Sequence, residues 1–367
     1  MGVLEKIEEI QAEMARTQKN KATEYHLGLL KAKLAKLRAQ LLEPSTKGGK
    51  PGEGFDVTKS GDARVALIGF PSVGKSSLLS KMTTTESLVA AYAFTTLTAV
   101  PGVLEMEGAR IQLLDLPGII EGAASGKGRG RQVVAVAKTA DLVLMVLDVN
   151  KAEEQKRLLE IELEAIGIRL NRKKPDILLK PKKAGGVSIS NTVPLTKIDE
   201  KTIRTILAGN KLHNMDVYIR EDVTVDEFID VLIGNRRYVN CIYLYNKIDT
   251  ISMEEVDRIA RQPYSVVCSV EEELNLDGLK KAIWEQLGLL RIYTKPRGRA
   301  VDLTEPIVVK KDATIEDVAN AIHRSIASKF KYALVYGRSS RFNPAAHRVG
   351  LHHKVADEDV VALFTNT

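Results

Sequence analysis

The sequence predicts an α/β protein built on a parallel sheet with helices on both of its faces. From Arg64 onward, short apolar runs rich in β-branched residues alternate with stretches of helical period. One of these runs leads into the glycine-rich stretch GFPSVGKSS at 69–77, which a helical pattern follows. Apolar residues make up 44% of the 367, which is enough for more than one hydrophobic core.

Residues 1–46 are expected to form a helical hairpin. One apolar stripe consists of Val3, Ile7, Ile10 and Met14, and leucines at 27, 30, 34, 37 and 41 repeat with the spacing of a coiled-coil seam. Packing within the chain and dimerisation both explain such a seam, and the first is favoured. The glycine- and proline-containing stretch KGGKPGEG then predicts a linker over 47–62.

The sheet is expected in two parts, 63–166 and 239–289. Its strand candidates are VALIGF, VLEME, IQLLDL, LVLMVLDV, CIYLYN and YSVVCS, and its helix candidates are 76–82, 131–139, 154–166 and 276–288. The two cysteines, Cys241 and Cys268, lie inside apolar strand candidates, so we expect buried thiols and no metal site.

We expect an inserted α+β subdomain at residues 167–238. The chain between the strand candidates LVLMVLDV and CIYLYN is much longer than a single crossover helix would need. The subdomain should contain a basic loop, a helix in EKTIRTILAG, a strand in DVYIRE and a helix opened by the capping box Thr224–Glu227. Residues 290–367 read as strand, strand, helix, strand, strand, with Thr314 and Asp317 opening the helix. That order predicts a small β-grasp domain.

The stretch 69–77 fits the phosphate-loop pattern G-x-x-x-x-G-K-[S/T] in its required setting between a strand and a helix. Gly69 and Gly74 would let backbone N–H groups turn inward around a polyphosphate. Lys75 should reach the β- and γ-phosphates and serve catalysis, and the Ser76 hydroxyl should ligate Mg²⁺. The other loop residues expected to contact the nucleotide are Ser72, Val73 and Ser77.

The stretch YNKID at 245–249 selects the base. Asp249 would accept from the two N–H donors of the guanine edge, Asn246 would brace the phosphate loop, and the Lys247 stem would lie over the ring. Ser269 fits the further base-binding loop. LTKID at 195–199 is a weaker alternative, because no buried strand precedes it, and Asp199 is better interpreted as a helix N-cap.

Two switch segments complete the set. In DLPG, Asp115 is expected to hold Mg²⁺ through a water and Gly118 to offer its N–H to the γ-phosphate. In AFTTLT, Thr96 is preferred over Thr95 and Thr98 as the residue that closes over Mg²⁺ and the γ-phosphate, where it would serve both metal binding and catalysis.

The net charge of +7 is concentrated in clusters. The stretch 169–183 carries seven basic residues against one acid, and 291–299 carries four and no acid. RNA is the leading partner for such clusters, and ordinary solvated loops are the alternative. No apolar run approaches the length of a membrane span, so we expect no membrane partner.

Together, GFPSVGKS, FTTLT, DLPGIIEGA, NKID and the β-grasp resemble the Obg-related translation-factor GTPases. The opening EMARTQKNKAT with HLGLLKAKLAKLR, and the insertion, resemble the developmentally regulated GTP-binding protein family, nearest its first paralogue. The resemblance runs from end to end. It implies a P-loop GTPase domain with an inserted domain, an N-terminal helical region and a C-terminal TGS domain.

The resemblance also implies a cytoplasmic GTP/GDP switch on translating ribosomes, with a zinc-finger-containing regulatory protein as partner. The chain would be a monomer or a heterodimer with that partner. Nucleotide-binding roles carry over to the motif residues of this sequence, namely Ser72 through Ser77, Thr96, Asp115, Gly118, Asn246, Lys247 and Asp249.

Ile119 stands where many GTPases have a water-orienting glutamine. The resemblance implies that the missing catalytic charge comes from elsewhere. One source is K⁺ beside the phosphates, although Ser72 replaces the asparagine common in potassium-activated relatives. The other is an arginine in cis, Arg129 or Arg131, or a group supplied in trans. Two further functions stay open: a GTP-binding scaffold without turnover, and a phosphotransferase.

Overall fold

The computed structural model describes residues 3–18, 20, 23–42, 61–83, 101–116, 137–234, 236–296 and 301–365. These residues fall into two compact units, each composed of several chain segments. The first unit draws on 1–55, 118–138 and 156–239, and the second on 56–117, 139–155 and 240–367. In these described ranges, no helix is long and apolar enough to cross a membrane.

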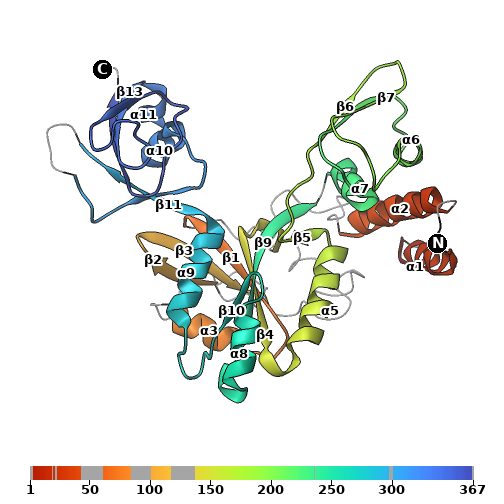
Figure 1. The fold of residues 1–367 in the computed structure, drawn as a ribbon, viewed down its shortest axis with the longest axis horizontal. Helices are drawn as coiled ribbons and strands as arrows, with labels where there is room; N and C mark the ends of the chain where they lie inside the picture. Colours follow the sequence, from red (N-terminus) through yellow and green to blue (C-terminus); the bar gives the residue numbers. More distant parts are fainter. Residues whose placement is uncertain are drawn as a thin grey trace, which may run out of the picture. The chain divides into compact units, whose positions relative to one another are not determined.

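The large sheet carries the phosphate loop. Its strands are β1 (Ala63–Ile68), β2 (Pro101–Met106), β3 (Ala109–Asp115), β4 (Leu142–Asp148), β9 (Arg237–Asn246) and β10 (Ser265–Val267), in the order β10-β9-β4-β1-β3-β2 (Figure 1). All neighbours run parallel except β2, which pairs with β3 antiparallel. The sheet is thus parallel as expected except at this edge, where a tight turn joins two consecutive strands directly.

Apolar side chains of two helices cover one face of this sheet. Helices α3 (Lys75–Met82) and α9 (Leu276–Leu287) pack on strand residues such as Leu67 and Leu144. The structure adds helix α8 (Met253–Ala260), which we did not predict, because half of its residues are charged and only Ile259 is buried. Of the expected helix 131–139, the described part, 137–139, is helical.

The first unit combines the N-terminal hairpin with the inserted subdomain. Helices α1 (Val3–Arg16) and α2 (Glu24–Leu42) pack together, as expected. α2 also packs on α6 (Glu200–Gly209) and α7 (Val225–Ile233) of the insert, where Ala32 and Ala35 join its core. Helix α2 is thus used for packing within the chain. Lys31 of α2 donates to Asp226 of α7 at 2.8 Å.

The insert contains a three-stranded sheet in the order β6-β8-β7. Its strands are β6 (Ile177–Pro181), β7 (Val187–Asn191) and β8 (Met215–Ile219), and the short β5 (Ile168–Leu170) pairs with β9. The stretch 169–183 is therefore not one basic loop. Its lysines obscured β6, in which buried and exposed residues alternate. β7 is a half-exposed strand rather than a buried one.

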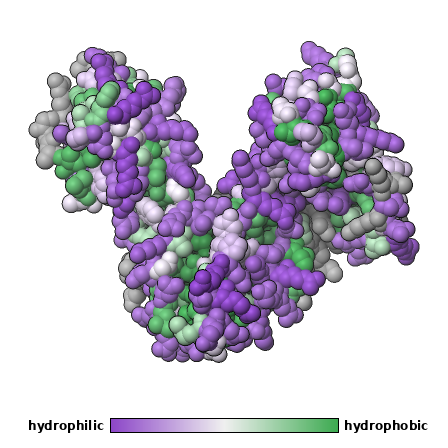
Figure 2. All heavy atoms as spheres, viewed as in Figure 1, coloured by the Kyte–Doolittle hydropathy of each residue, from purple (hydrophilic) through white to green (hydrophobic). Residues whose placement is uncertain are grey.

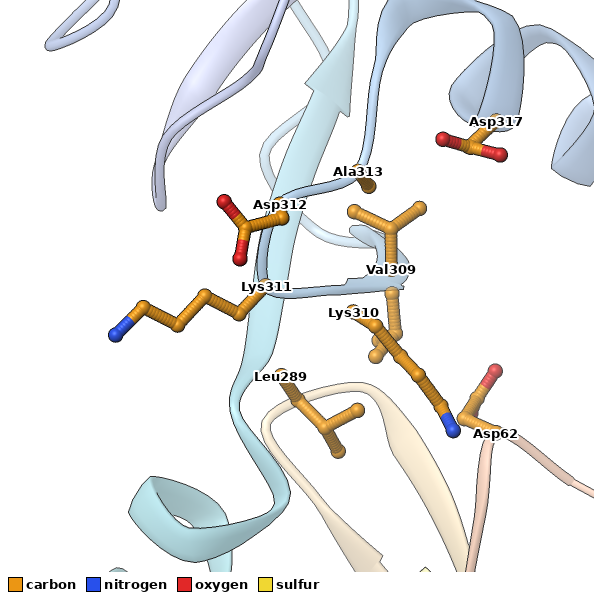
Figure 3. Close-up of a pocket in the computed structure, with 9 residues that line it drawn as sticks. Asp62, Leu289, Val309, Lys310, Lys311, Asp312, Ala313 and Asp317 are labelled. Atoms are coloured by element: carbon orange, nitrogen blue, oxygen red, sulfur yellow. The ribbon is translucent and has the colours of Figure 1, made fainter. Parts of the chain in front are cut away.

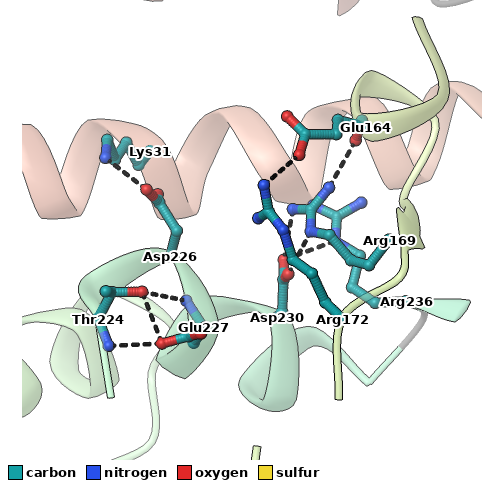
Figure 4. Close-up of polar contacts among 9 residues, drawn as sticks. All are labelled: Lys31, Glu164, Arg169, Arg172, Thr224, Asp226, Glu227, Asp230 and Arg236. Carbon is teal, nitrogen blue, oxygen red and sulfur yellow. Dashed lines mark hydrogen bonds and ion pairs between the residues drawn. The ribbon is translucent and has the colours of Figure 1, made fainter. Parts of the chain in front are cut away.

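A buried polar cluster lies at the base of the insert (Figure 4). Asp230, 5% exposed, accepts from Arg169 Nε at 2.6 Å and from Arg236 Nε at 2.9 Å. Burial lowers the pKa of Arg236 and the charge of Asp230 opposes that shift. Burial also lowers the pKa of Lys138, and the nearby Arg236 lowers it further. Asp230 thus ties β5 and the start of β9 to α7.

The C-terminal domain is a five-stranded sheet in the order β12-β11-β15-β13-β14 with two helices. Its elements are β11 (Leu289–Thr294), β12 (Ile307–Lys310), α10 (Ile315–Ile322), α11 (Arg324–Ser328), β13 (Phe330–Tyr336), β14 (His347–Val349) and β15 (Asp359–Thr365). The capping box of Thr314 and Asp317 is present. The expected single helix ends at His323, whose backbone is extended, and β14 is an additional short strand.

Candidate nucleotide-binding site

The motif residues that the structure describes follow the carboxyl ends of neighbouring parallel strands. The phosphate loop follows β1, Asp115 ends β3, Asn246 ends β9, and Ser269 lies just after β10. In open α/β sheets ligands bind at this edge, where the strand order changes direction. Here β1 has β3 on one side and β4 on the other, so the loop lies at such a position.

The glycines of the phosphate loop are required by their surroundings. A Cβ on Gly69 would collide with the carbonyl oxygen of Val146 on the neighbouring strand. Gly74 has φ +96°, and a Cβ there would collide with the Asn246 amide nitrogen. Ser72 also takes a positive φ, of 62°. The loop is therefore held in a tight turn whose backbone lies close to the rest of the site.

Lys75 points back into the loop. Its ammonium donates to the carbonyl oxygens of Gly69 at 2.9 Å and Phe70 at 2.8 Å. Burial lowers the pKa of Lys75, and the negative charge of Asp115 opposes the shift. An anion in the loop would give this desolvated cation the counter-charge that two neutral carbonyls cannot supply.

Ser76 and Asp115 form the site that fits a hard cation. The Ser76 hydroxyl donates to Asp115 Oδ2 at 3.1 Å. Asp115 is buried, and its other oxygen, Oδ1, is buried without a hydrogen-bond partner. An orphaned carboxylate oxygen beside a hydroxyl is the donor chemistry that Mg²⁺ prefers, so these residues fit the metal.

Asn246 joins the base motif to the phosphate loop. Its amide donates to the carbonyl oxygen of Val73 at 2.8 Å, and its Oδ1 accepts from the backbone N–H of Val270 at 3.0 Å. Both bonds are buried. The expected brace is therefore present, and it extends to the loop after β10.

Lys247 is held by a residue that the sequence reasoning missed. It has φ 68°, and its ammonium donates to Asp148 Oδ2 at 2.6 Å. The other Asp148 oxygen accepts from the N–H of Asn150 at 3.0 Å. Burial would raise the pKa of Asp148, but these bonds, with Lys247 first, outweigh it and lower the pKa. Asp148 could have been proposed from the sequence, because it ends β4, and β4 lies beside β9 in the sheet.

Asp249 and Ser269, the other two residues predicted to contact the guanine base, differ in exposure. Asp249 lies in a short 3₁₀ turn (Ile248–Thr250), and its side chain is exposed. Ser269 is fully buried, and its hydroxyl accepts from the N–H of Glu272 at 3.4 Å. Ser269 thus shapes the loop from within. The preceding Cys268 is buried too, and burial raises the pKa of its thiol to about 12.

The alternative motif fails in the structure as anticipated. Asp199 is the N-cap of α6, where its carboxylate accepts from the N–H of Thr202 at 2.9 Å. Thr96, Gly118, Ile119, Arg129 and Arg131 lie outside the described residues. In the part of the chain that is described, no cluster of three or more His, Cys, Asp or Glu could hold a metal.

Two of the cavities of the described residues involve none of the predicted site residues. One, of about 510 Å³, is lined by Asn150, Lys151, Tyr245 and Gln262 among others. The other, of about 410 Å³, lies by the turn after β12, where Lys310 and Lys311 are among the lining residues (Figure 3). Lys310 is neutralised by Asp141 at 2.6 Å. None of the predicted site residues lines either cavity.

Three family descriptions match successive parts of the chain. The model described as a 50S ribosome-binding GTPase matches residues 64–181, and one described as the C-terminal region of that domain matches 184–289. The TGS domain matches 290–365. A crystal structure of a GTP-binding protein from Pyrococcus horikoshii covers 83% of this chain and all of its own, with a TM-score of 0.44 and 16% identity.

Full-length relatives are much closer in sequence. The chain is 63% identical over 363 residues to developmentally-regulated GTP-binding protein 2 of Homo sapiens, covering 99% of both chains. It is 62% identical over 365 residues to GTP-binding protein 1 of Schizosaccharomyces pombe, covering both completely. The human relative carries the number 2, so it does not support the expected proximity to the first paralogue.

Proposed function

The chain belongs to the developmentally regulated GTP-binding proteins, and from this we propose that it is a Mg²⁺-dependent GTPase that acts as a switch on ribosomes. The observation that carries the proposal is Asn246, which bonds both the phosphate loop and the loop after β10. One side chain thereby couples the site for the phosphates to the site for the base.

Each residue has a distinct task in this proposal. Lys75 would leave the carbonyls of Gly69 and Phe70 and bind the β- and γ-phosphates. Ser76 and Asp115 would hold Mg²⁺, directly and through a water, and the ion would neutralise phosphate charge. Asp249, exposed beside Lys247, would accept from the guanine edge, which adenine cannot match.

The ribosome is proposed as partner on two grounds. The matching family is described by its binding to the 50S ribosome. The insert also carries exposed lysines that suit a phosphate backbone, including Lys173, Lys174 and Lys183. We extend the proposal to a cytoplasmic location and to a zinc-finger-containing regulatory protein as the chain's heterodimer partner.

The catalytic charge is proposed to come from K⁺, because Ile119 can neither donate nor accept a hydrogen bond. Arg129 and Arg131 are the alternative source, and an arginine used in this way contributes about 10³–10⁵ in rate. Since the nucleotide motifs contain no side chain that positions water, we expect slow intrinsic turnover.

The deciding experiment measures phosphate release from GTP by the purified chain with Mg²⁺, in K⁺ and in Na⁺ at equal ionic strength. Strong stimulation by K⁺ supports the cation, and equal slow rates support an arginine or a group in trans. Lys75→Met should abolish release, whereas Lys280→Met on α9 should not change it. A protein that binds GTP but releases no phosphate, even with K⁺ and ribosomes, would be a scaffold rather than an enzyme.

A further inference from the structure

The loop after β10, residues 268–275, is bonded to the segment that carries the base motif. The carbonyl oxygen of Cys268 accepts from the backbone N–H of Ile248 at 3.3 Å. Two residues later, the N–H of Val270 donates to Asn246 Oδ1 at 3.0 Å, in a buried bond. The first part of the loop is therefore fixed beside the residues that we propose bind guanine.

The rest of the loop has a backbone that its own residues do not favour. Ser269 and Leu274 exchange two backbone hydrogen bonds, at 3.2 and 2.9 Å, so the residues between them form a tight turn. Glu273 has φ 55° and Asn275 has φ 59°, both in the left-handed region. Asparagine tolerates this conformation, whereas it is strained for glutamate. Such a turn persists only where surrounding contacts hold it in place.

Lys81 of α3 provides contacts of this kind. Its ammonium donates to the carbonyl oxygen of Glu271 at 2.8 Å and pairs with Glu273 Oε1 at 2.9 Å. The Lys81 side chain is only 33% exposed, so solvent screens these contacts less than it screens an ion pair in open water. One side chain thus holds both the backbone of the turn and its strained residue.

Helix α3 thereby connects two parts of the nucleotide site. It begins at Lys75 in the phosphate loop, and Lys81 lies in its last turn. The loop after β10 is consequently held at two places, by Asn246 from β9 and by Lys81 from α3. A cation in the last turn of a helix also stabilises the helix dipole, but that role would need neither Glu271 nor Glu273.

We propose that Lys81 is a positioning residue for guanine recognition, because it holds the loop after β10 in the conformation that contacts the base. The inference rests on the proposed function, since the loop has this role only if guanine binds beside Asp249. Residues that contact a ligand must be held within about 0.5 Å of the productive geometry by supporting contacts. Loss of Lys81 should therefore weaken the contact with the base and leave Lys75 and Ser76 in place.

The test uses the full chain and GDP that carries a fluorescent label on its ribose, released by excess unlabelled GDP in a stopped-flow instrument. Lys81→Met should release the labelled GDP roughly 3- to 10-fold faster, with an unchanged association rate. Lys81→Arg keeps the charge and the donors and should restore slow release. The matched control is Lys354→Met, which breaks an exposed pair with Asp312 and should release at the wild-type rate.

A double variant separates positioning of the loop from stabilisation of the helix. Glu273→Gln should speed release less than Lys81→Met does, because the bond to the Glu271 carbonyl remains. The two changes combined should release no faster than Lys81→Met alone, since both remove the same contact. All rates are measured well below the melting temperature of each variant.

Equal release rates in Lys81→Met and the wild type would overturn the inference, as would independent effects of the two changes in the double variant. A wild type that binds no guanine nucleotide would overturn the proposed function, and this inference with it. The two failures are therefore distinguishable.

Discussion

Asn246 and Asp249 have different roles in the proposed recognition of guanine. Asn246 is buried and fully engaged with the protein, since it bonds Val73 and Val270. Asp249 is exposed and can bond a ligand. Asn246 therefore holds the loops of the site together, and Asp249 is the residue that we propose selects the base.

Asp249→Asn should change the preferred base from guanine to xanthine. An amide accepts from N1–H of xanthine and donates to its C2 carbonyl, but it loses one bond to guanine. We expect GTP affinity to fall at least about tenfold and xanthosine triphosphate to bind instead. Competition against a fluorescent nucleotide measures both. Asp257→Asn, which breaks an exposed ion pair with Arg261, serves as control and should leave both affinities unchanged.

Asp148→Asn should loosen Lys247 and speed nucleotide release. The lost charge-assisted bond is worth about 1 kcal/mol in this partly exposed position, or roughly fivefold in the dissociation rate. Stopped-flow release of a labelled GDP measures it, with Asp277→Asn on α9 as the control. An unchanged rate would show that Lys247 is positioned without Asp148.

The stability that the Asp148–Lys247 pair contributes should decrease at low pH. Burial would raise the pKa of Asp148, but its bonds to Lys247 and Asn150 hold it below the ordinary value of 3.8. A depressed carboxylate pKa stabilises the folded state above that ordinary value, and the stabilisation is lost as pH falls through the folded pKa. The difference in unfolding free energy between the wild type and Asp148→Asn should therefore be constant from pH 6 to 8 and shrink below about pH 4.

At the scale of elements, the turn from β1 into α3 depends on contact with β9. Gly74 begins α3 as its N-cap, in a left-handed conformation and against the Asn246 amide. Sequence reasoning assigned the glycine to phosphate binding. The structure adds a second constraint: the Asn246 amide of the base motif occupies the space that a Cβ on Gly74 would need.

Gly74→Ala should damage both stability and nucleotide binding. The positive φ costs about 1–3 kcal/mol for a residue with a Cβ, and the collision with Asn246 displaces the brace. The melting temperature and the affinity for GTP should both fall. Gly350→Ala is the matched control, because a Cβ there meets nothing within 4 Å. Wild-type affinity in Gly74→Ala would mean that the loop tolerates the displacement.

Asp230→Asn should destabilise the insert strongly. It leaves Arg169 and Arg236, both mostly buried, without a counter-charge, which costs about 3–5 kcal/mol. Asp176→Asn breaks an exposed pair with Arg220 and should cost at most about 1 kcal/mol. Urea unfolding of both variants gives the comparison. Similar losses would show that the buried cluster contributes little to stability.

On the scale of the whole molecule, polar side chains cover most of the face seen in Figure 2. The basic residues of the insert differ in their availability. Lys182 is held by Asp216 at 2.6 Å, whereas Lys173, Lys174 and Lys183 are exposed. A test of ribosome binding should therefore use the exposed three.

Reversal of Lys173, Lys174 and Lys183 to glutamate should weaken co-sedimentation with ribosomes and flatten its dependence on salt. Each lost phosphate contact reduces the slope by about 0.7 to 0.9. GTP binding should stay unchanged, since none of these three lysines belongs to the nucleotide motifs. Co-sedimentation equal to that of the wild type would exclude these lysines as the ribosome contact.

Elements with a clear period or a capping signal were predictable. The hairpin, the core strands and the capping boxes at Thr224 and Thr314 all match the structure. Elements of atypical composition were not. The charged α8, the strand β6 within a basic stretch and the short β14 are set by tertiary packing and pairing, which override weak local propensity.

By itself the sequence determined where the nucleotide-binding motifs of this GTPase family lie, because their residue types recur at fixed spacings in Gly69–Ser77, Asp115 and Asn246–Asp249. Only the tertiary structure decided which residues support them. Asp148 meets Lys247, and Gly74 meets Asn246, across strand pairings or between loops. Such contacts join positions far apart in the chain, and no local pattern specifies them.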